Sequence, residues 1–426
     1  MGGSIGKVRW KICALLFAAV VLSYIDRLVL GVLKPTTLQP MYHWSEQGYA
    51  QMVLTFQGAY GIGFLLFGRL IDRIGAKLGY LVAMGLWTAA HMAHGLVTSV
   101  GGFTLVRIPL ALGESGTYPA ALAAASEWFP QKERALAIGI FNAGANVGAV
   151  VTPLIVPVLT LAMGWQSAFW VTGLFNLVWI AAWVIFYRRP REHPRIGAEE
   201  LALIESDPPI VQKQVPWRRL LTTRQVWAYM SGRFLIDPVW WMFLSWLPDF
   251  FHRLYGIDLK GFGPPLVAIY IIADVGSILG GFASSRMLAR GFSANRARKL
   301  AMLGAALVVV PVAFAAWAPT PLIAVILIGL ACAGHQGFSS NLFTMPADLF
   351  PRWAQGSVVG LGGFAGAAGG MLMSYYAGWV LQTIGSYGPI LVICAMAYLL
   401  ALLVVHLINP SYAPVTKFGS PEEAKP

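Results

Sequence analysis

The sequence predicts an all-α membrane protein of twelve transmembrane helices, arranged as two pseudo-symmetric six-helix bundles. Three observations lead to this prediction. Hydrophobic residues make up 57% of the 426 positions while charged residues make up only 11%, long apolar segments recur along the chain, and one polar stretch divides them. An ordinary soluble domain carries about 25% charged residues. A soluble fold this apolar would expose large hydrophobic patches to water.

Twelve apolar segments are each long enough to cross the bilayer's hydrocarbon core, which takes about 20 residues. The expected spans are 11–34, 46–70, 78–98, 101–128, 134–160, 166–187, 225–252, 263–288, 299–317, 320–347, 357–381 and 387–408. The intervening stretch is charged and punctuated by proline. The sequence therefore predicts four parts, namely a bundle at 1–187, a cytoplasmic linker at 188–224, a second bundle at 225–408 and a cytoplasmic tail at 409–426.

The positions of the Lys and Arg residues predict the orientation of the chain. If both termini are cytoplasmic, 24 of the 30 Lys and Arg residues fall in cytoplasmic segments, as the positive-inside rule requires. Only Lys34, Arg253 and Lys260 fall on the other side of the membrane, and Arg27, Arg107 and Arg233 lie within expected spans. The net charge of +12 then reflects loop anchors whose partner is the lipid bilayer, and it requires no nucleic acid.

The two halves share a charged turn. Gly68-Arg69-Leu70-Ile71-Asp72-Arg73 follows the second expected span, and a related segment without the carboxylate, 281–286, follows the eighth. Parallel repeats suit a transporter whose halves rock around a site near the membrane midplane. In the first copy Gly68, Asp72, Arg73, Gly75 and Lys77 place glycines, a carboxylate and cations at a cytoplasmic helix end. There they could form a breakable charge–dipole latch.

The segment from Gly68 to Lys77 resembles the signature loop of major facilitator transporters. Within that superfamily, three further segments resemble the anion:cation symporter branch. They are Ser23-Tyr24-Ile25-Asp26-Arg27, Arg107 with Gly113-Glu114, and 126–134. The resemblance extends over nearly the whole chain, and it implies the major facilitator fold and a location in the bacterial inner membrane.

Three segments of the second half are most similar to the bacterial hexuronate transporters, which carry glucuronate and galacturonate. These segments are 233–240, 273–276 and Gly334-His335-Gln336. This resemblance implies import of a sugar-acid anion together with protons. We expect at least one proton to enter with each anion.

Four ionisable side chains lie inside expected spans of the first half. A charge at the bilayer centre costs at least ~2.5–3.5 kcal/mol, so function or pairing keeps it there. Asp26 and Arg27 point ~100° apart on a helix, so each is free to face a different partner. Arg107 and Glu114 share one helix face but stand ~10.5 Å apart along the axis. We expect these two to bond across helices, or to each other through water.

Arg27 is the candidate for binding the substrate's carboxylate, because a guanidinium is a planar donor that keeps its charge. Proton coupling instead needs a group that titrates, and a carboxylate taken out of water can do so near neutral pH. Asp26 and Glu114 are the candidates, and the family resemblance implies the same pair. Arg107 would stabilise the ionised form of Glu114.

A sugar acid also carries hydroxyls, which need polar partners and an aromatic face. The first-half candidates are Tyr24, Gln57, Tyr60 and Asn146, and the second-half candidates are Trp240, Trp241, His335, Gln336, Ser339 and Asn341. Tyr60 matches a tyrosine of the family's site. Ordinary helix packing is the alternative for the second-half set. Arg233 and Asp237 are four residues apart and most simply pair with each other, whereas Asp274 stays ambiguous.

Two alternatives remain open. The same machinery could carry another organic anion, such as an aldonate, an aromatic acid or a dicarboxylate. A membrane-embedded enzyme or sensor is the alternative from another class, but no HExxH or GxSxG motif stands out. We expect a monomer that is not an enzyme and holds no metal or cofactor. Cys13, Cys332 and Cys394 lie in apolar runs and have no metal-ligand spacing.

Overall fold

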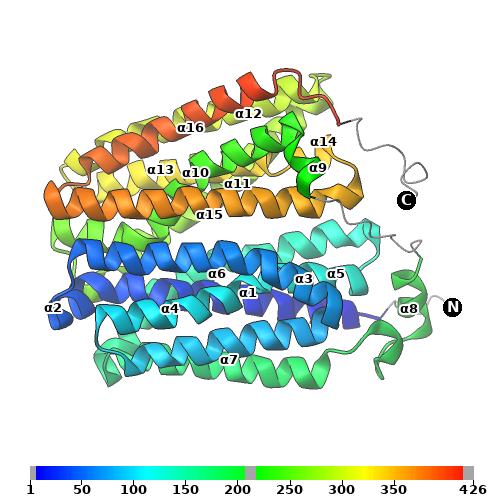
Figure 1. Cartoon of the computed structure of the whole chain (residues 1–426), viewed down its shortest axis with the longest axis horizontal. Coiled ribbons are helices and arrows are strands. Elements are labelled where there is room, and N and C mark those ends of the chain that lie inside the picture. Colours follow the sequence, from blue (N-terminus) through cyan, green and yellow to red (C-terminus); the bar gives the residue numbers. More distant parts are fainter. Residues whose placement is uncertain (1–5, 207–216, 416–426) are drawn as a thin grey trace. The chain divides into compact units, whose positions relative to one another are not determined.

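The structure is a computed structural model that describes residues 6–206 and 217–415. All of the elements in these two ranges are helices, and the predicted all-α membrane fold is confirmed (Figure 1). Parts of the expected linker and tail, at 207–216 and 416–426, lie outside the described residues. Contacts divide the chain into two compact units. Unit 1 comprises Met1–Ile210 and Ser245–Val267, and unit 2 comprises Val211–Leu244 and Ala268–Pro426.

Unit 1 holds helices α1 to α8, which run from blue to green in Figure 1, together with η4. Their bounds are α1 Val8–Leu33, η1 Lys34–Leu38, α2 Gln39–Tyr42, α3 Glu46–Ala93, η2 His94–Leu96, α4 Val100–Ser115, α5 Thr117–Trp128, α6 Gln131–Met163, α7 Gln166–Phe186, η3 Pro190–Glu192, α8 Ala198–Ile204 and η4 Leu259–Gly261. Two helix starts follow from serine caps. The Ser45 hydroxyl accepts from the backbone N–H of Gly48 at the start of α3, and Ser99 does the same for Gly102 at the start of α4.

The long helix α3 contains two of the expected spans. Gly75 interrupts it with φ 79° and ψ 168°, a conformation that only glycine adopts without strain. A Cβ placed on Gly116 would touch both Phe67 and Ala83, which stand eight residues before and eight after Gly75. The two halves of α3 therefore run back alongside each other. The glycine predicted for this signature loop makes the turn between them.

The expected span 101–128 is divided into α4 and α5. The chain tightens at Gly116, whose N–H donates to the carbonyl of Gly113 at 3.0 Å, a bond across three residues instead of four. A similar division occurs in the second half, where the expected span 320–347 is α13 followed by the short α14. Periodicity alone does not locate such breaks, because the apolar pattern continues across them.

Unit 2 and the segments joining it to unit 1 hold the remaining helices. Their bounds are α9 Trp217–Leu221, α10 Arg224–Tyr255, α11 Gly263–Ala289, α12 Ala294–Val309, η5 Val310–Trp317, α13 Pro321–Leu342, α14 Met345–Leu349, α15 Arg352–Thr383 and α16 Gly388–Ile408. Helix α10 leaves unit 2 at Leu244, and its last turns belong to unit 1. These last turns contribute to a charged cluster described below.

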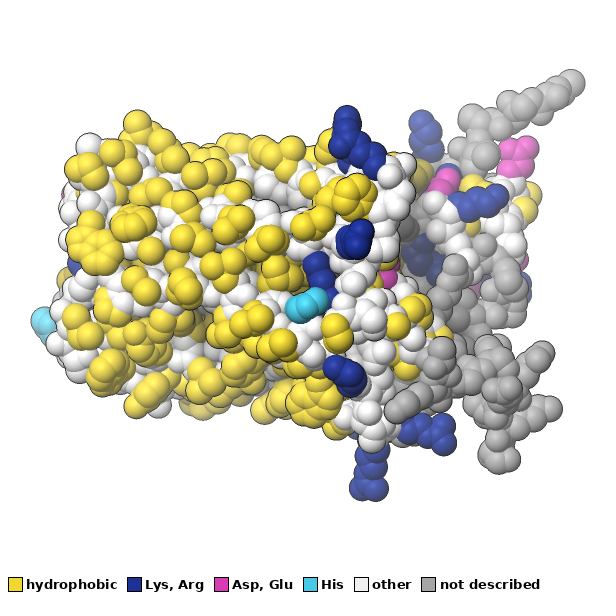
Figure 2. All heavy atoms as spheres, turned by 90° about the horizontal axis from the view of Figure 1, so that it is seen from above, with side chains coloured by type: hydrophobic (Ala, Val, Ile, Leu, Met, Phe, Trp, Pro, Cys, Tyr) yellow, Lys and Arg dark blue, Asp and Glu magenta, His cyan; other side chains and the backbone are white. Residues whose placement is uncertain are grey.

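In the described part of the chain, nine helical stretches are long and apolar enough to cross a membrane. One of them, 46–96, contains both halves of α3. The other expected spans correspond to the α4–α5 pair and to α10, which carries several charged residues. Hydrophobic side chains cover most of the face seen in Figure 2, and most of the visible Lys and Arg side chains gather toward one end.

A buried carboxylate fixes the start of α1 to the linker helix α8. Glu200 accepts hydrogen bonds from the backbone N–H groups of Val8, at 3.2 Å, and Arg9, at 3.1 Å. The guanidinium of Arg9 donates to Glu200 at 3.1 Å and pairs with Glu133 of α6 at 2.7 Å. A negative charge at a helix N-terminus is favourable because it faces the positive end of the helix dipole. This end of unit 1 is therefore held by three elements at once.

Candidate functional site

A buried ion pair joins α1 to α4. The Nε and Nη2 of Arg27 each lie 2.9 Å from a single oxygen, Oε2 of Glu114. The Glu114 side chain is fully buried and that of Arg27 is 9% exposed. The second oxygen, Oε1, is buried without a hydrogen-bond partner among the described residues. A proton taken up by Glu114 would therefore sit on Oε1 and weaken the hold of Oε2 on Arg27.

Aromatic rings surround the Arg27 guanidinium. Its central carbon lies 4.9 Å from the ring centres of both Tyr24 and Tyr60, and 5.7 Å from that of Phe56. Such rings stabilise a cation through their electron-rich faces. The structure thus brings together three sequence-predicted residues, namely Arg27, Tyr24 and Tyr60. Both tyrosines are half-buried, so their hydroxyls and ring faces line the surroundings of the cation.

Arg107 has a different setting. Within the described residues it makes no hydrogen bond to Glu114, nor to Tyr24 or Tyr60, the two tyrosines beside Arg27. Its guanidinium lies 5.1 Å from the ring centre of Phe56, and its Nε is buried without a partner among the described residues. The sequence left open whether Glu114 bonds across helices or to Arg107 through water. The structure gives the bond across helices, to Arg27. Phe56 therefore lies near both guanidinium groups, those of Arg27 and Arg107.

Asp26 faces the interior of unit 1, on a different side of α1 from Arg27. Its Oδ2 accepts from the indole N–H of Trp87 on α3, at 2.7 Å, and from the amide of Asn176 on α7, at 2.6 Å. Its Oδ1 lies 3.1 Å from Nε2 of His91. All four side chains are buried. Asp26 was predicted from the sequence but its partners were not, because nothing in the local sequence links it to Trp87, Asn176 or His91.

The other first-half candidates lie in three settings. Gln57 is completely buried on α3, and Asn146 is half-buried on α6. Asp72 and Arg73 of the signature loop are exposed beside the Gly75 turn, with Gly68 on the preceding helix. Beyond the turn, the carbonyl of Lys77 accepts from the indole N–H of Trp183 at 3.2 Å. The loop residues are therefore at one end of unit 1, away from Arg27.

Unit 2 has its own buried ion pair. Arg233 Nε lies 2.6 Å from Oδ2 of Asp237, one turn further along α10, as the spacing predicted. The guanidinium also donates to the hydroxyl of Tyr229 at 3.2 Å and lies 4.3 Å from the ring centre of Phe343. A Cβ on Gly366 of α15 would overlap Asp237 Oδ2. The glycine is therefore needed for α15 to approach the pair.

His335 organises the aromatic candidates of unit 2. Its ring stacks on Trp240, with centroids 5.0 Å apart and planes 6° from parallel. Nδ1 lies 2.7 Å from the Tyr398 hydroxyl, and Nε2 lies 3.3 Å from the Ser339 hydroxyl. Trp240 is half-buried while His335 is 4% exposed. The structure therefore groups Trp240, His335 and Ser339 into one polar and aromatic surface.

The remaining second-half candidates are placed differently. The buried amide of Asn341 donates to the carbonyls of Gly280 and Gly337, at 3.1 and 3.0 Å, so it joins α13 to α11. This is the helix-packing role that the sequence left as the alternative. Trp241, Gln336 and Asp274 are each half-buried.

A four-residue ionic cluster lies where α1 ends. Lys34 is completely buried, and its Nζ lies 2.7 Å from Glu46 Oε2 and 2.6 Å from Asp249 Oδ1. Arg253 completes the cluster with contacts of 2.6 Å to Glu46 and 3.4 Å to Asp249. We refer to Lys34, Glu46, Asp249 and Arg253 as the Lys34 cluster. It ties the last turns of α10 to η1 and to the start of α3.

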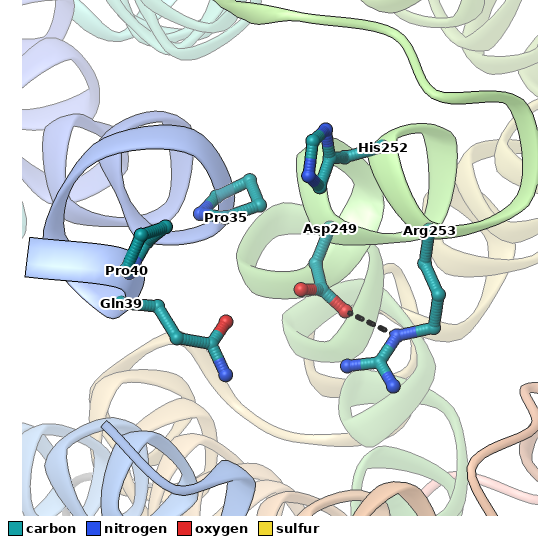
Figure 3. A pocket seen from close by; sticks show the side chains of 6 residues that line it. All are labelled: Pro35, Gln39, Pro40, Asp249, His252 and Arg253. Atoms are coloured by element: carbon teal, nitrogen blue, oxygen red, sulfur yellow. Dashed lines mark ion pairs between the residues drawn. The ribbon is translucent and has the colours of Figure 1, made fainter. Parts of the chain in front are cut away.

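A cavity of about 410 Å³ adjoins the Lys34 cluster. Figure 3 shows Pro35, Gln39 and Pro40 on one side of it, and Asp249, His252 and Arg253 on the other. The sequence predicted Lys34 at the outer end of the first span, and the structure buries its side chain completely at the start of a π-helical turn. The signal in the sequence is an ionisable residue next to a proline near the end of each of two helices, Lys34 at the end of α1 and Asp249 near the end of α10. Their pairing depends on tertiary contacts.

Comparison with known proteins agrees with this architecture. The family model described as Major Facilitator Superfamily matches residues 16–367. The hexuronate transporter of Escherichia coli (strain K12) is 32% identical over 406 residues, covering 93% of each chain. The galacturonate transporter of Dickeya chrysanthemi is 33% identical over 313 residues, covering 71% of this chain and 90% of the relative.

The fold is also that of a solved transporter. The inward-facing, occupied crystal structure of a bacterial homolog of the human lysosomal transporter Spinster superposes with a TM-score of 0.71. The match covers 96% of this chain and 97% of that one, at 18% sequence identity. Helix order, family match and relatives agree, and they concern transporters and not enzymes. The chain belongs to the Major Facilitator Superfamily and is a multi-pass membrane transporter.

Proposed function

We propose that this transporter imports a hexuronate anion, such as galacturonate or glucuronate, together with protons. The observation that carries the proposal is the buried Arg27–Glu114 ion pair, with its 2.9 Å contacts to one carboxylate oxygen. The similarity to the Escherichia coli and Dickeya transporters supports the substrate class. A location in the bacterial cytoplasmic membrane, with both termini on the cytoplasmic side, is part of the proposal.

The substrate's carboxylate and Glu114 compete for Arg27. While Glu114 is ionised it occupies the two donors of the guanidinium that point toward it. When Glu114 takes a proton its charge disappears, and the guanidinium can form the same bidentate contact with a carboxylate from solution. Anion binding therefore follows protonation. Tyr24 and Tyr60 flank the guanidinium and offer ring faces and hydroxyls to the sugar.

Residues of unit 2 also offer aromatic faces and polar groups to the sugar part of the anion. Trp240 presents a half-buried ring stacked on His335, and sugar rings pack well against such aromatic faces. Ser339 and Gln336 add hydroxyl and amide groups on the same helix, α13. Gln57 and Asn146 do so in unit 1. We propose alternating access, in which the parts 1–187 and 225–408 rock around the anion while the linker at 188–224 keeps them joined.

The number of protons decides which gradient drives import. A monoanion that moves with one proton carries no net charge, so the pH gradient and its own gradient drive it. Two protons, one each on Asp26 and Glu114, would give a net charge of +1 and add about 2.3 kcal/mol per 100 mV of membrane potential. The presence of two separate buried carboxylates, with different partners, supports the second case.

A competition assay tests the substrate class. Purified protein in liposomes would take up labelled galacturonate while glucuronate, galactonate, an aromatic acid or a dicarboxylate is added in excess. We expect glucuronate to compete best, since it shares the carboxylate and ring of galacturonate. If an aldonate, aromatic acid or dicarboxylate displaces the label more strongly than glucuronate does, the substrate belongs to that other class of organic anion. The proposed substrate would then be that class of organic anion and not a hexuronate.

A further inference from the structure

The surroundings of Asp26 contain a titratable side chain that the transport scheme does not use. His91, on the second half of α3, is completely buried, and its Nε2 lies 3.1 Å from Asp26 Oδ1. The same nitrogen makes a 2.7 Å hydrogen bond to the hydroxyl of Thr172 on α7. The Thr172 hydroxyl donates a hydrogen bond to the carbonyl of Ala168 at 2.7 Å. Since it has one hydrogen, it accepts from His91 Nε2–H in this arrangement.

The hydrogen bonds of Asp26 decide which of its oxygens can carry a proton. Trp87 Nε1–H and Asn176 Nδ2–H are donors that cannot act as acceptors, and both are directed at Oδ2. Oδ1 makes no hydrogen bond within the described structure, although His91 Nε2 is close to it. A proton on Asp26 therefore sits on Oδ1. This is the oxygen that faces His91.

The histidine also has an open second nitrogen. His91 Nδ1 is buried and has no hydrogen-bond partner among the described residues. The ring centre of His94, three residues further along, lies 6.3 Å from that of His91. Nε2 of His94 is likewise buried and has no hydrogen-bond partner among the described residues. Nδ1 of His94 bonds to the carbonyl of Ala90 at 2.8 Å, which leaves Nε2 as an acceptor. His91 thus lies beside both Asp26 and a second buried histidine just after the end of α3.

We propose that His91 exchanges protons with Asp26, so that the proton reaches this carboxylate from the side of α1 that faces α7 and the second half of α3, about 100° around the helix from Arg27. This inference rests on the proposed proton coupling and adds a route to it. In the step, the proton to be transported binds Nδ1 of neutral His91, and Nε2–H of the resulting imidazolium breaks as Oδ1–H of Asp26 forms, which leaves a neutral imidazole with its hydrogen on Nδ1. When Asp26 does not accept the proton, Nε2–H of His91 donates a hydrogen bond to the Thr172 hydroxyl.

The charged groups around His91 favour passage of a proton through the imidazole over a long-lived protonated imidazole. Asp26 on α1 is the carboxylate beside it, and Arg107 on α4 is the cation whose field acts on both His91 and His94. Thr172 and Asn176 on α7 and Trp87 on α3 are neutral. Because a cation repels a second positive charge nearby, a proton passes along the rings and does not stay on them. Proton entry and anion entry would then use separate sides of α1.

The test compares two rates in the same proteoliposomes. One is uptake of labelled galacturonate driven by an inward proton gradient. The other is exchange of labelled for unlabelled galacturonate at equal pH. For His91→Gln we expect the ratio of driven uptake to exchange to fall about 10²-fold, the lower end of what a positioned proton-transfer group contributes. Trp87→Phe is the matched control, since it removes an Asp26 contact without removing a proton carrier, and both of its rates should change in proportion.

Each outcome separates the inference from the proposed function. A wild-type ratio in His91→Gln, with wild-type uptake clearly gradient-driven, would overturn the route through His91 and leave proton coupling intact. An equal fall of both rates would reduce His91 to a packing residue. If wild-type protein exchanges galacturonate but gains nothing from the gradient, proton coupling fails and the histidine route fails with it.

A second variant covers the case in which His91→Gln does not fold. Thr172→Val removes the hydroxyl that accepts from His91 Nε2–H, so Nε2–H donates instead to Asp26 Oδ1, and this hydrogen bond stabilises the ionised carboxylate. The pH at which driven uptake is half-maximal should then move to lower pH, because more acid is needed to protonate Asp26. An unchanged pH profile would contradict the exchange between His91 and Asp26.

Discussion

Asp26 and Arg27 are adjacent in the sequence, yet they take part in two separate buried networks on different sides of α1. Asp26 bonds to Trp87 and Asn176, whereas Arg27 pairs with Glu114 at 2.9 Å. The 100° between neighbouring helical residues makes this division unavoidable. One dipeptide can thus serve a proton on one face and an anion on the other.

Replacing Arg27 by Lys should weaken anion binding while keeping the charge. Lysine cannot form the planar, two-point contact that Arg27 makes with Glu114 Oε2. Losing a charge-assisted hydrogen bond of about 1.5–3 kcal/mol should raise the half-saturating concentration of the anion roughly 10- to 100-fold. Initial rates of uptake over a range of concentrations measure this. Arg290→Lys, at an exposed position, should leave the value unchanged, and an unchanged value for Arg27→Lys would exclude Arg27 as the anchor.

Replacing Glu114 by Gln should uncouple anion binding from protons. Glutamine resembles the protonated carboxyl, so Arg27 would be open to the anion at every pH. We expect exchange of labelled anion to continue with little pH dependence, while uptake driven by a proton gradient is lost. The comparison is a pH series of both rates, with the exposed Glu192→Gln as control. Wild-type pH dependence in Glu114→Gln would remove Glu114 from the coupling step.

Replacing Lys34 by Met should destabilise unit 1. The change leaves Glu46 and Asp249 buried with only Arg253 as a cationic partner in the Lys34 cluster. Removing one member of a buried ion pair costs about 3–5 kcal/mol of folding free energy. Thermal unfolding of the detergent-purified variant should show a clear loss of Tm. Lys11→Met, exposed on the same helix α1, should cost under about 0.5 kcal/mol. Equal Tm values for the two variants would mean that burial of the Lys34 cluster contributes no stability.

Replacing Glu200 by Gln should loosen the first turn of α1. The charged carboxylate accepts from two backbone N–H groups and from Arg9, at 3.1–3.2 Å. A neutral amide loses the attraction to the guanidinium and to the helix N-terminus, at a cost of about 1–3 kcal/mol. Hydrogen exchange at Val8 and Arg9 should speed up, while the exposed neighbour variant Glu199→Gln should match wild type. Unchanged protection at these amides would show that another contact holds the turn.

The sequence predicted the course of the chain better than the contacts within it. Apolar length depends on each residue's own chemistry, which is why the twelve expected spans fall on helical segments, although 101–128 and 320–347 are each divided into two helices. The i,i+4 pair of Arg233 and Asp237 was also predictable, because both members lie on one helix face. The Gly75 turn followed from the signature loop.

Pairs that join different helices could not be predicted in this way. Arg27 with Glu114, Asp26 with His91, and Lys34 with Asp249 are separated by long stretches of chain, and their meeting depends on how helices rotate and pack. Lys34 illustrates the difficulty. Its sequence position places it at the outer end of the first expected span, whereas its complete burial depends on two carboxylates from other segments.

The most direct test of proton-coupled import measures uptake of labelled galacturonate and glucuronate into proteoliposomes, with and without an inward proton gradient at fixed voltage. Wild-type protein and Asp26→Asn are compared, since asparagine keeps the shape of Asp26 but cannot take up a proton. We expect the gradient to accelerate uptake by wild type and to have no effect on Asp26→Asn. Equal uptake by wild type with and without the gradient would contradict proton coupling.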